Sequence, residues 1–253
     1  MSADAARGRR SFARLALCCL AVAGGAAWAQ RAQSAATPST RNSAEVELAR
    51  RFVGVWQPLG RSLGLSSNPV LTPAAEAEVA AQTQRLRAGD MTADLGAQCV
   101  PRTMPSMTSF GAQEILADVK KITWIMEASN AIRWIWLDGR AHPPAEEIRP
   151  TAMGHSIARR EGDTLVVDSV GFMAKSRMYV NRPLYETVAP SEQMHVVERM
   201  HLAKDGRMLV IERTVTDPAI LAQPWVTTVR YERHDDWEIG EIVCEENNRT
   251  SDY

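Results

Sequence analysis

From residue 121 onward, apolar and polar residues alternate with a period of two, which is the pattern of β-strands with one buried face. Together with Val53–Trp56, these runs predict about nine strands: 53–56, 122–127, 132–137, 155–160, 164–170, 194–202, 207–216, 225–233 and 237–244. Short loops join most of them, and no helical crossover of about 10–15 residues separates them, which favours antiparallel meanders. We therefore predict an all-β fold in which an antiparallel meander forms a closed or nearly closed, lipocalin-like barrel, because closure removes exposed strand edges.

Short helices are predicted in the N-terminal segment 43–90, outside the barrel. Ser43–Phe52 carries caps and charges suited to a helix. Thr72 is a good N-cap, Pro73 suits the first helical position, and the run that follows to Arg87 is rich in helix-forming residues. Because the apolar face of this second run is mostly alanine, we expect it to lie on the surface.

The turn signal Glu161-Gly162-Asp163 lies between two β-prone runs and predicts a hairpin. The hairpin brings His155, at the start of one strand, close to Asp168 and Val170 near the end of the other. A purely structural strand would carry apolar residues at such positions, so His155 and Asp168 are candidates for acid–base chemistry.

A second hairpin can be registered from charge. With Asp205-Gly206 as a two-residue turn, two opposite-charge pairs form: Arg199 with Glu212, and Glu198 with Arg213. The two pairs fall on different strand faces, of which the one with Arg199 and Glu212 is polar and also carries His195. This polar face could be exposed to water, or it could line a ligand cavity inside the barrel.

Residues 1–29 have the composition of an export signal. A basic region precedes the apolar run 15–27, and Ala27-Trp28-Ala29 is a small-x-small cleavage site. The run is shorter than the ~20 apolar residues of a membrane span, so we expect no stable membrane anchor. Arg9-Arg10 and its surroundings resemble a twin-arginine signal, which predicts a periplasmic protein. Residues 30–42 are rich in Ala, Ser, Thr and Pro, and we expect a disordered leader there.

Cleavage after Ala29 leaves 253 − 29 = 224 residues, and we expect residues 43–253 to form one domain. The formal net charge is −1 and basic residues are scattered among acidic ones, which argues against a nucleic-acid partner. The mature chain keeps Cys99 and Cys244, which predicts a disulfide between them in an oxidising compartment, with two buried thiols as the alternative. The oligomeric state, including a homo-oligomer, stays open.

Five side chains on the predicted strands are candidate catalytic groups: His155, Asp168, His195, Arg199 and Glu212. A histidine has an unperturbed pKa of about 6.5, which suits proton transfer at neutral pH, and a neighbouring carboxylate would orient it. Arg199 could stabilise an oxyanion or bind a substrate carboxylate. Either histidine could instead be a hydrogen-bonded structural residue.

Aromatic side chains offer flat apolar walls for a ligand: Trp124, Trp134, Trp136, Phe172 and Trp225. Ordinary core packing is the alternative for each of them. A metal site is a weaker hypothesis, because the potential ligands lack an HExxH or CxxC spacing: His142, His155, His195, His201, Glu198 and Glu212. No nucleophile elbow or phosphate-binding glycine loop occurs in the sequence, and no organic cofactor is expected.

Several motifs resemble those of a large family of exported bacterial β-rich proteins without a generally assigned function. The motifs lie between residues 99 and 248: Leu137-Asp138-Gly139-Arg140 with His142-Pro143, Gly154-His155-Ser156-Ile157, Glu161 to Asp168 with Gly171-Phe172, Met194 to Arg199, Asp217-Pro218 with Trp225, and Cys244 to Asn247. The resemblance implies a barrel-like domain and supplies no reaction. Arg213 stands where that pattern has an apolar residue, which favours Arg199 and Glu212 as site residues.

Two functions remain open on these grounds. The first is a cofactor-independent lyase or isomerase that acts by general acid–base catalysis on a small hydrophobic, aromatic molecule and eliminates water or a one-carbon fragment such as formaldehyde. The second is a non-catalytic, lipocalin-like periplasmic protein that binds the same kind of molecule.

Overall fold

The structure is a computed structural model of the chain, and it describes residues 40–60, 66–96, 98–180 and 186–241. These residues belong to the second of two compact units, 38–253. The predicted export signal, most of the predicted leader, and Cys244 with its predicted disulfide lie outside the described residues. No described helix is long and apolar enough to cross a membrane.

Two α-helices and eleven strands make up the described part of the chain. The helices are α1 (Thr40–Arg50) and α2 (Pro73–Arg87). The strands are β1 (Gly54–Pro58), β2 (Gln113–Ala117), β3 (Lys121–Met126), β4 (Ala131–Trp136), β5 (His155–Glu161), β6 (Thr164–Val170), β7 (Met178–Tyr179), β8 (Thr187–Val188), β9 (His195–Ala203), β10 (Met208–Thr216) and β11 (Trp225–His234). Four short 3-10 turns, 91–93, 107–109, 127–129 and 145–147, lie in the connections between them.

Nine strands form a closed barrel in the order β1-β11-β10-β9-β6-β5-β4-β3-β2, and β7 pairs with β8 separately. The ring closes because β1 pairs with β11 on one side and with β2 on the other. The predicted all-β barrel is confirmed. The wholly antiparallel meander is wrong at one junction, where β4 and β5 run parallel. Parallel neighbours require the chain to cross back, and here the irregular segment 137–154 does so without a long helix.

The set of barrel strands differs from the sequence prediction at two places. β2 was missed because its pattern is mixed: the inward-facing Gln113 is polar, and the outward-facing Leu116 is apolar and 42% exposed. The expected strand 237–244 is absent over its described part, 237–241. Trp237 there stacks on His234, and the Gly240 amide donates to Glu127.

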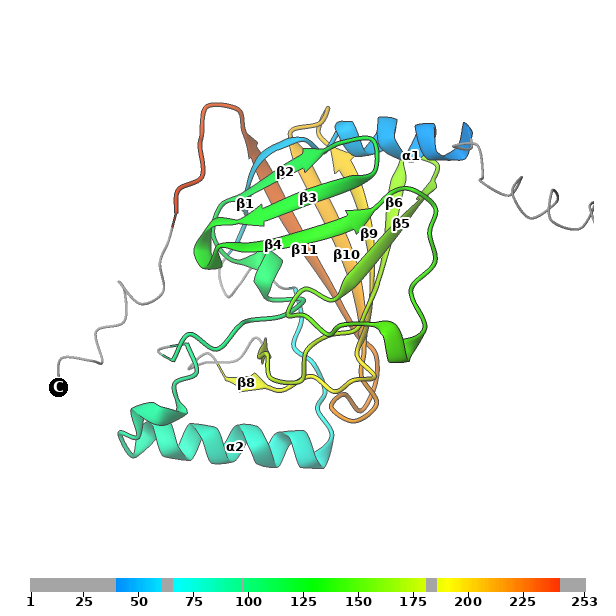
Figure 1. Ribbon diagram of the computed structural model, residues 1–253. Helices are drawn as coiled ribbons and strands as arrows, with labels where there is room; N and C mark the ends of the chain where they lie inside the picture. The colour runs from blue at the N-terminus through cyan, green and yellow to red at the C-terminus, as the bar shows by residue number, and fades with distance from the viewer. Residues whose placement is uncertain (1–39, 61–65, 97, 181–185, 242–253) are drawn as a thin grey trace, which may run out of the picture. The chain divides into compact units, whose positions relative to one another are not determined.

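One helix lies on the outside of the barrel wall and the other lies apart from it. α1 packs against β2, β5 and β6, and its first three residues were expected to belong to the leader. The N-cap and the proline of α2 are as predicted, since Thr72 accepts a hydrogen bond from the Ala75 amide at 3.3 Å. α2 lies next to the β7–β8 pair, away from the barrel strands (Figure 1).

Both predicted hairpins have the expected register. In the first, His155 lies opposite Val170 across the β5–β6 pair. In the second, β9 and β10 place Glu212 opposite Arg199 and Arg213 opposite Glu198. Charge pairing therefore identified the register correctly.

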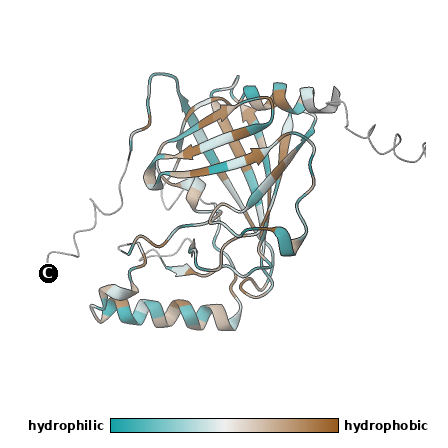
Figure 2. Cartoon of the chain, in the orientation of Figure 1, coloured by the Kyte–Doolittle hydropathy of each residue, from teal (hydrophilic) through white to brown (hydrophobic). Residues whose placement is uncertain are grey.

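The alternation along the strands decides which face is the interior (Figure 2). On β9 and β10, the largely apolar face is inside, and it carries Glu198 and Arg213 into the barrel with no exposed surface. The polar face with Arg199 and Glu212 is outside. The hypothesis that this polar face lines an inner cavity is wrong, because the apolar residues of the opposite face have to be buried.

Three charged side chains lie at the centre of the barrel. Arg213 Nε donates to Glu198 Oε1 at 2.6 Å, and Arg133 Nη2 lies 2.5 Å from Glu198 Oε2. All three residues are fully buried. Burial alone would raise the pKa of Glu198, but Arg133 and Arg213 outweigh it and hold the pKa below its usual value. Glu198 is therefore ionised, and the three side chains form a buried triad with one net positive charge.

Polar groups around the triad bond most of its atoms, while Arg133 Nη1 has no hydrogen-bond partner among the described residues. Arg133 donates to Ser156 and Ser169, at 3.2 and 2.9 Å. Arg213 donates to Tyr231 at 3.2 Å and to Thr108, and the Tyr231 hydroxyl also donates to the Thr108 carbonyl. Bulky apolar side chains fill the space around these groups: Trp56, Trp124, Ile115, Ile122, Ile135 and Met126. The barrel interior is packed rather than hollow along this stretch.

We predict that Glu198→Gln destabilises the protein by about 3–5 kcal/mol, because two guanidinium groups would then lie buried without an opposing charge. Urea unfolding measures the loss. The control is Glu212→Gln on the exposed face of β10, which should change the free energy of unfolding by no more than about 0.5 kcal/mol. A loss below about 1 kcal/mol for Glu198→Gln would show that the triad is not a structural requirement.

Candidate functional site

Three histidines and one aspartate form a cluster on the outer wall of the barrel. His142 Nδ1 lies 2.8 Å from His155 Nδ1, and His142 Nε2 lies 3.1 Å from Asp168 Oδ1. His195 Nε2 lies 2.8 Å from the same Asp168 oxygen. The side chains are half-buried, with exposed fractions of 20% for His142, 31% for Asp168 and 40% for His195. They form a continuous chain of contacts from His155 to His195.

Two barrel strands and one loop position the cluster. Asp168 lies on β6 and His195 begins β9, and both side chains point outward, as the register of these neighbouring strands requires. His155 begins β5. His142 comes from the crossover 137–154 and lies between His155 and Asp168.

The start of the crossover is held against the barrel wall by local contacts. Gly139 has a φ of +75°, which allows the tight turn after β4. Arg140 then folds back, bonds both oxygens of Asp138, and places its guanidinium 3.7 Å from the centre of the Trp136 ring. This anchored turn leads the chain to His142.

The proton positions follow from the acceptor chemistry of Asp168. A carboxylate oxygen accepts, so His142, when it is neutral, donates from Nε2 and keeps a lone pair on Nδ1. That lone pair accepts from Nδ1 of His155. His155 is then protonated at Nδ1, and its Nε2 carries a lone pair with no hydrogen-bond partner in the described part of the chain. Nε2 of His155 is thus the basic atom of the cluster.

The surroundings of His155 keep it neutral. Burial lowers its pKa below the usual value near 6.5, and the neighbouring His142 and Arg140 lower it further, while Asp138 acts in the opposite direction. A proton that reaches Nε2 can be compensated through the relay, because His142 can take the Nδ1 proton and is held by Asp168.

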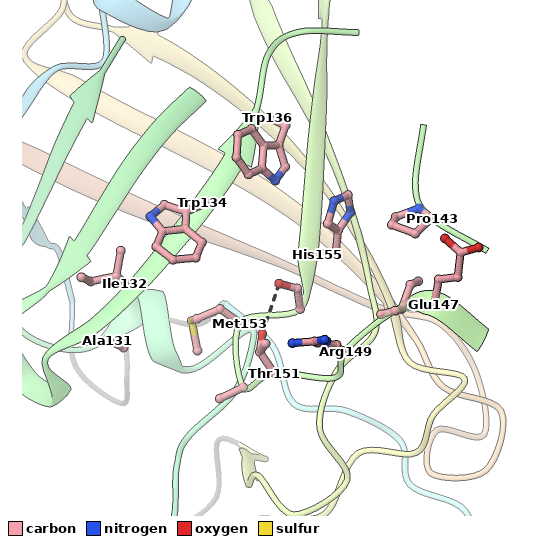
Figure 3. A pocket seen from close by; sticks show the side chains of 13 residues that line it. Ala131, Ile132, Trp134, Trp136, Pro143, Glu147, Arg149, Thr151, Met153 and His155 are labelled. Atoms are coloured by element: carbon pink, nitrogen blue, oxygen red, sulfur yellow. Dashed lines mark hydrogen bonds between the residues drawn. The ribbon is translucent and has the colours of Figure 1, made fainter. Parts of the chain in front are cut away.

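An apolar cavity of about 500 Å³ opens beside His155. Trp134 and Trp136 project from the same face of β4 along its wall, and Figure 3 shows His155 next to them. Pro143, Glu147, Arg149 and Met153, all from the crossover, line the other side. A hydrogen bond from Thr151 to the Gly154 carbonyl holds this part of the crossover. The volume is in the range of small-molecule sites.

The structure brings three of the five expected catalytic residues together, namely His155, Asp168 and His195. Arg199 and Glu212 are not in the cluster. Arg199 is four residues along β9 from His195, about 13 Å at the rise of a strand, and it bonds Glu161 at 2.8 Å. Both belong to the exposed ladder of charges on the outer wall.

The aromatic candidates divide in the same way. Trp134 and Trp136 line the cavity, and Trp134 is 52% exposed. The other three belong to the hydrophobic core: Trp124, Phe172 and Trp225. The indole of Trp124 donates to Gln113 and that of Trp225 to Ser67, so each has a structural partner.

His142 is the residue that sequence reasoning missed as a catalytic candidate, since it was considered only as a potential metal ligand. The turn formed by Asp138 to Arg140 is what directs this histidine back to β5. Of the six proposed metal ligands, three lie in the cluster, namely His142, His155 and His195, whereas Glu198 lies inside the barrel and Glu212 is exposed. Among the described residues, no group of three or more such side chains has an arrangement that could hold a metal ion.

No protein-family model matches the sequence, and comparisons with curated proteins and with solved structures also find no match. The family resemblance therefore stays a prediction, and the cluster has to be interpreted from its own chemistry.

Proposed function

We propose that this protein is a cofactor-independent lyase or isomerase that acts on a small aromatic molecule, with His155 as the general base. The supporting observation is that His155 lies beside an apolar cavity, at one end of a chain of ring contacts that runs through His142 to Asp168. A base that stays neutral near pH 7 and a wall of two tryptophans are what such chemistry requires.

The reaction needs no redox partner, because one imidazole can move a single proton between two atoms of the substrate. In the elimination of water, His155 Nε2 takes a proton from carbon and returns it to the departing hydroxyl oxygen. In the release of formaldehyde, it takes the hydroxyl proton of a hydroxymethyl group, the carbon–carbon bond breaks, and the proton returns to the carbon that was left. Atoms and electrons balance in both cases.

The other members of the cluster are positioning residues in this proposal. Asp168 orients His142 and stabilises the positive charge that develops when His155 is protonated. His195 bonds the same oxygen and fixes the carboxylate. Trp134 and Trp136 hold the aromatic part of the substrate next to the imidazole.

The alternative is a protein that carries the same ligand without reacting with it, and the apolar walls of the cavity are compatible with that function too. The two differ in whether the basic nitrogen is needed. We also propose, from the sequence of residues 1–29, that either activity takes place in the periplasm.

The first test replaces the base. His155→Gln should lower kcat by about 10²–10⁴-fold, the usual contribution of a general base, and leave the ligand Kd within about tenfold. The assay offers aromatic compounds with hydroxymethyl or β-hydroxy groups, and follows formaldehyde release and the absorbance of conjugated alkenes. His201→Gln on β9 is the matched control and should keep full activity. Equal loss of binding and turnover, or no turnover of any such compound, would favour the carrier.

The second test is the pH profile of kcat/KM. Because burial lowers the pKa of His155, the base should stay active as the pH falls through 6.5, and the acid limb should have its midpoint below about 6.5. The residual activity of His155→Gln should lack this limb. A midpoint at or above the ordinary value would contradict the assignment of His155.

The third test concerns the aromatic wall. Trp134→Ala should weaken ligand binding by about 3–10-fold, because one aromatic contact contributes about 0.5–1.5 kcal/mol beyond the area it buries. Isothermal titration calorimetry, which does not depend on tryptophan fluorescence, measures the affinity. Trp237→Ala removes a comparably exposed tryptophan outside the cavity, 44% against 52% exposed, and should leave the affinity unchanged. The same loss in both variants would mean that the cavity is not the binding site.

A further inference from the structure

A second cavity, of about 280 Å³, lies under α1 and shares no lining residue with the apolar cavity. Its walls come from α1, β5, β6 and the turn after β4, and Asp168 is one of them. The cavity is therefore connected to the histidine cluster through a side chain that belongs to both. The proposed reaction gives it no role.

Glu45 on α1 is the unusual residue of this cavity. It is 7% exposed, and its Oε2 has no hydrogen-bond partner among the described residues. Burying a carboxylate without a partner is costly, and such groups in native proteins are normally satisfied by a bound molecule or an ion. Glu47, two residues along the same helix, is exposed to solvent.

The other charged side chains that line the cavity already have ionic partners. Arg140 bonds Asp138, and Arg159 bonds Glu161 at 2.7 Å. Asp168 receives both of its histidines on Oδ1, and no described group bonds its Oδ2. Glu45 and Asp168 therefore share one small space, and no described lysine or arginine bonds either of them.

We propose that this cavity binds the ammonium group of a small primary amine between Glu45 and Asp168. The apolar part of the amine packs on Leu137, Ile157 and Val166, which line the same space. At about 30 Å³ for each water molecule, the cavity has room for about nine waters, so the ligand is limited to a few heavy atoms. An ammonium group supplies three donors, which suits two carboxylates.

The proposed amine site takes no part in the proposed reaction, but an amine bound there would influence the histidine cluster that carries it out. A cation on Asp168 changes the electrostatic surroundings of His142 and His195, which bond the same carboxylate. The amine is thus an effector of the cluster rather than its substrate, and its binding can be measured without any turnover.

The test uses propylammonium chloride, with 1-propanol and sodium chloride as comparison probes, on protein labelled with ¹⁵N in its histidines. Propylammonium should produce saturable shifts in the imidazole resonances of His142 and His195, and should bind at least tenfold more tightly than 1-propanol. Glu45→Gln should weaken its binding at least tenfold, while Glu47→Gln should stay within about twofold of the unchanged protein. These shifts report on Asp168 and would not respond to a merely structural role of Glu45.

A second variant keeps the test decisive if Glu45→Gln fails to fold. Ile157→Trp enlarges a side chain on the cavity-facing side of β5 without altering the charge of the cavity, and should abolish propylammonium binding. The proposal is overturned if saturating propylammonium shifts neither histidine, if Glu45→Gln binds it with unchanged affinity, or if sodium produces the same shifts. Catalysis by His155 could survive each of these outcomes, and amine binding could survive the loss of turnover.

Discussion

The attraction between Glu198 and the two arginines that flank it inside the barrel is the interaction on which the rest of the structure depends. Charges in a fully buried place must be matched by partners, and the partners come from several strands at once: Arg133 from β4, Glu198 from β9 and Arg213 from β10. Hydroxyl groups of β5, β6 and β11 complete the set. A slip of one residue in any of these strands would move its charge to the outer face and leave the others unpaired, so the triad specifies the register of the barrel.

Because the interior of the barrel is filled by side chains, the candidate reactive groups lie on its outer wall. Most lipocalin-like proteins would be expected to bind a ligand in the lumen, but here tryptophans and the triad occupy that space along the centre of the barrel. The outward residues of β5, β6 and β9 then become the platform for reactive groups, and the crossover after β4 supplies both the missing histidine and one wall of the cavity. The parallel β4–β5 pair is what gives this crossover its length, since a hairpin would have been too short to carry His142 back to Asp168.

The sequence predicted local structure well where one physical rule acts alone. The Thr72-Pro73 helix start and the Asp205-Gly206 register follow from capping and from opposite charges, and both are confirmed. It predicted poorly where distant parts of the chain decide the outcome. Gln113 is polar and yet inside because it bonds Trp124 and Thr108, so β2 has no clean alternation. The sequence left the direction of Glu198 open, because its second counterion, Arg133, lies on a strand 65 positions earlier, since 198 − 133 = 65. His142 was missed as part of the site because loop geometry has no periodic signal.

Asp168 is the residue at which these constraints meet. Its place on β6 is set by the register, its Oδ1 is shared by two histidines, and it lines a cavity of its own. A carboxylate that only oriented one imidazole would gain from being enclosed, because low dielectric strengthens its hydrogen bond. Instead it is 31% exposed and faces a space that is also lined by Glu45, whose Oε2 has no hydrogen-bond partner among the described residues. Two carboxylates kept together without a counterion repel each other, and this cost is reduced when a cation lies between them. The proposed amine would therefore reduce the repulsion between these two carboxylates, and it would lie two hydrogen bonds from His155, through Asp168 and His142.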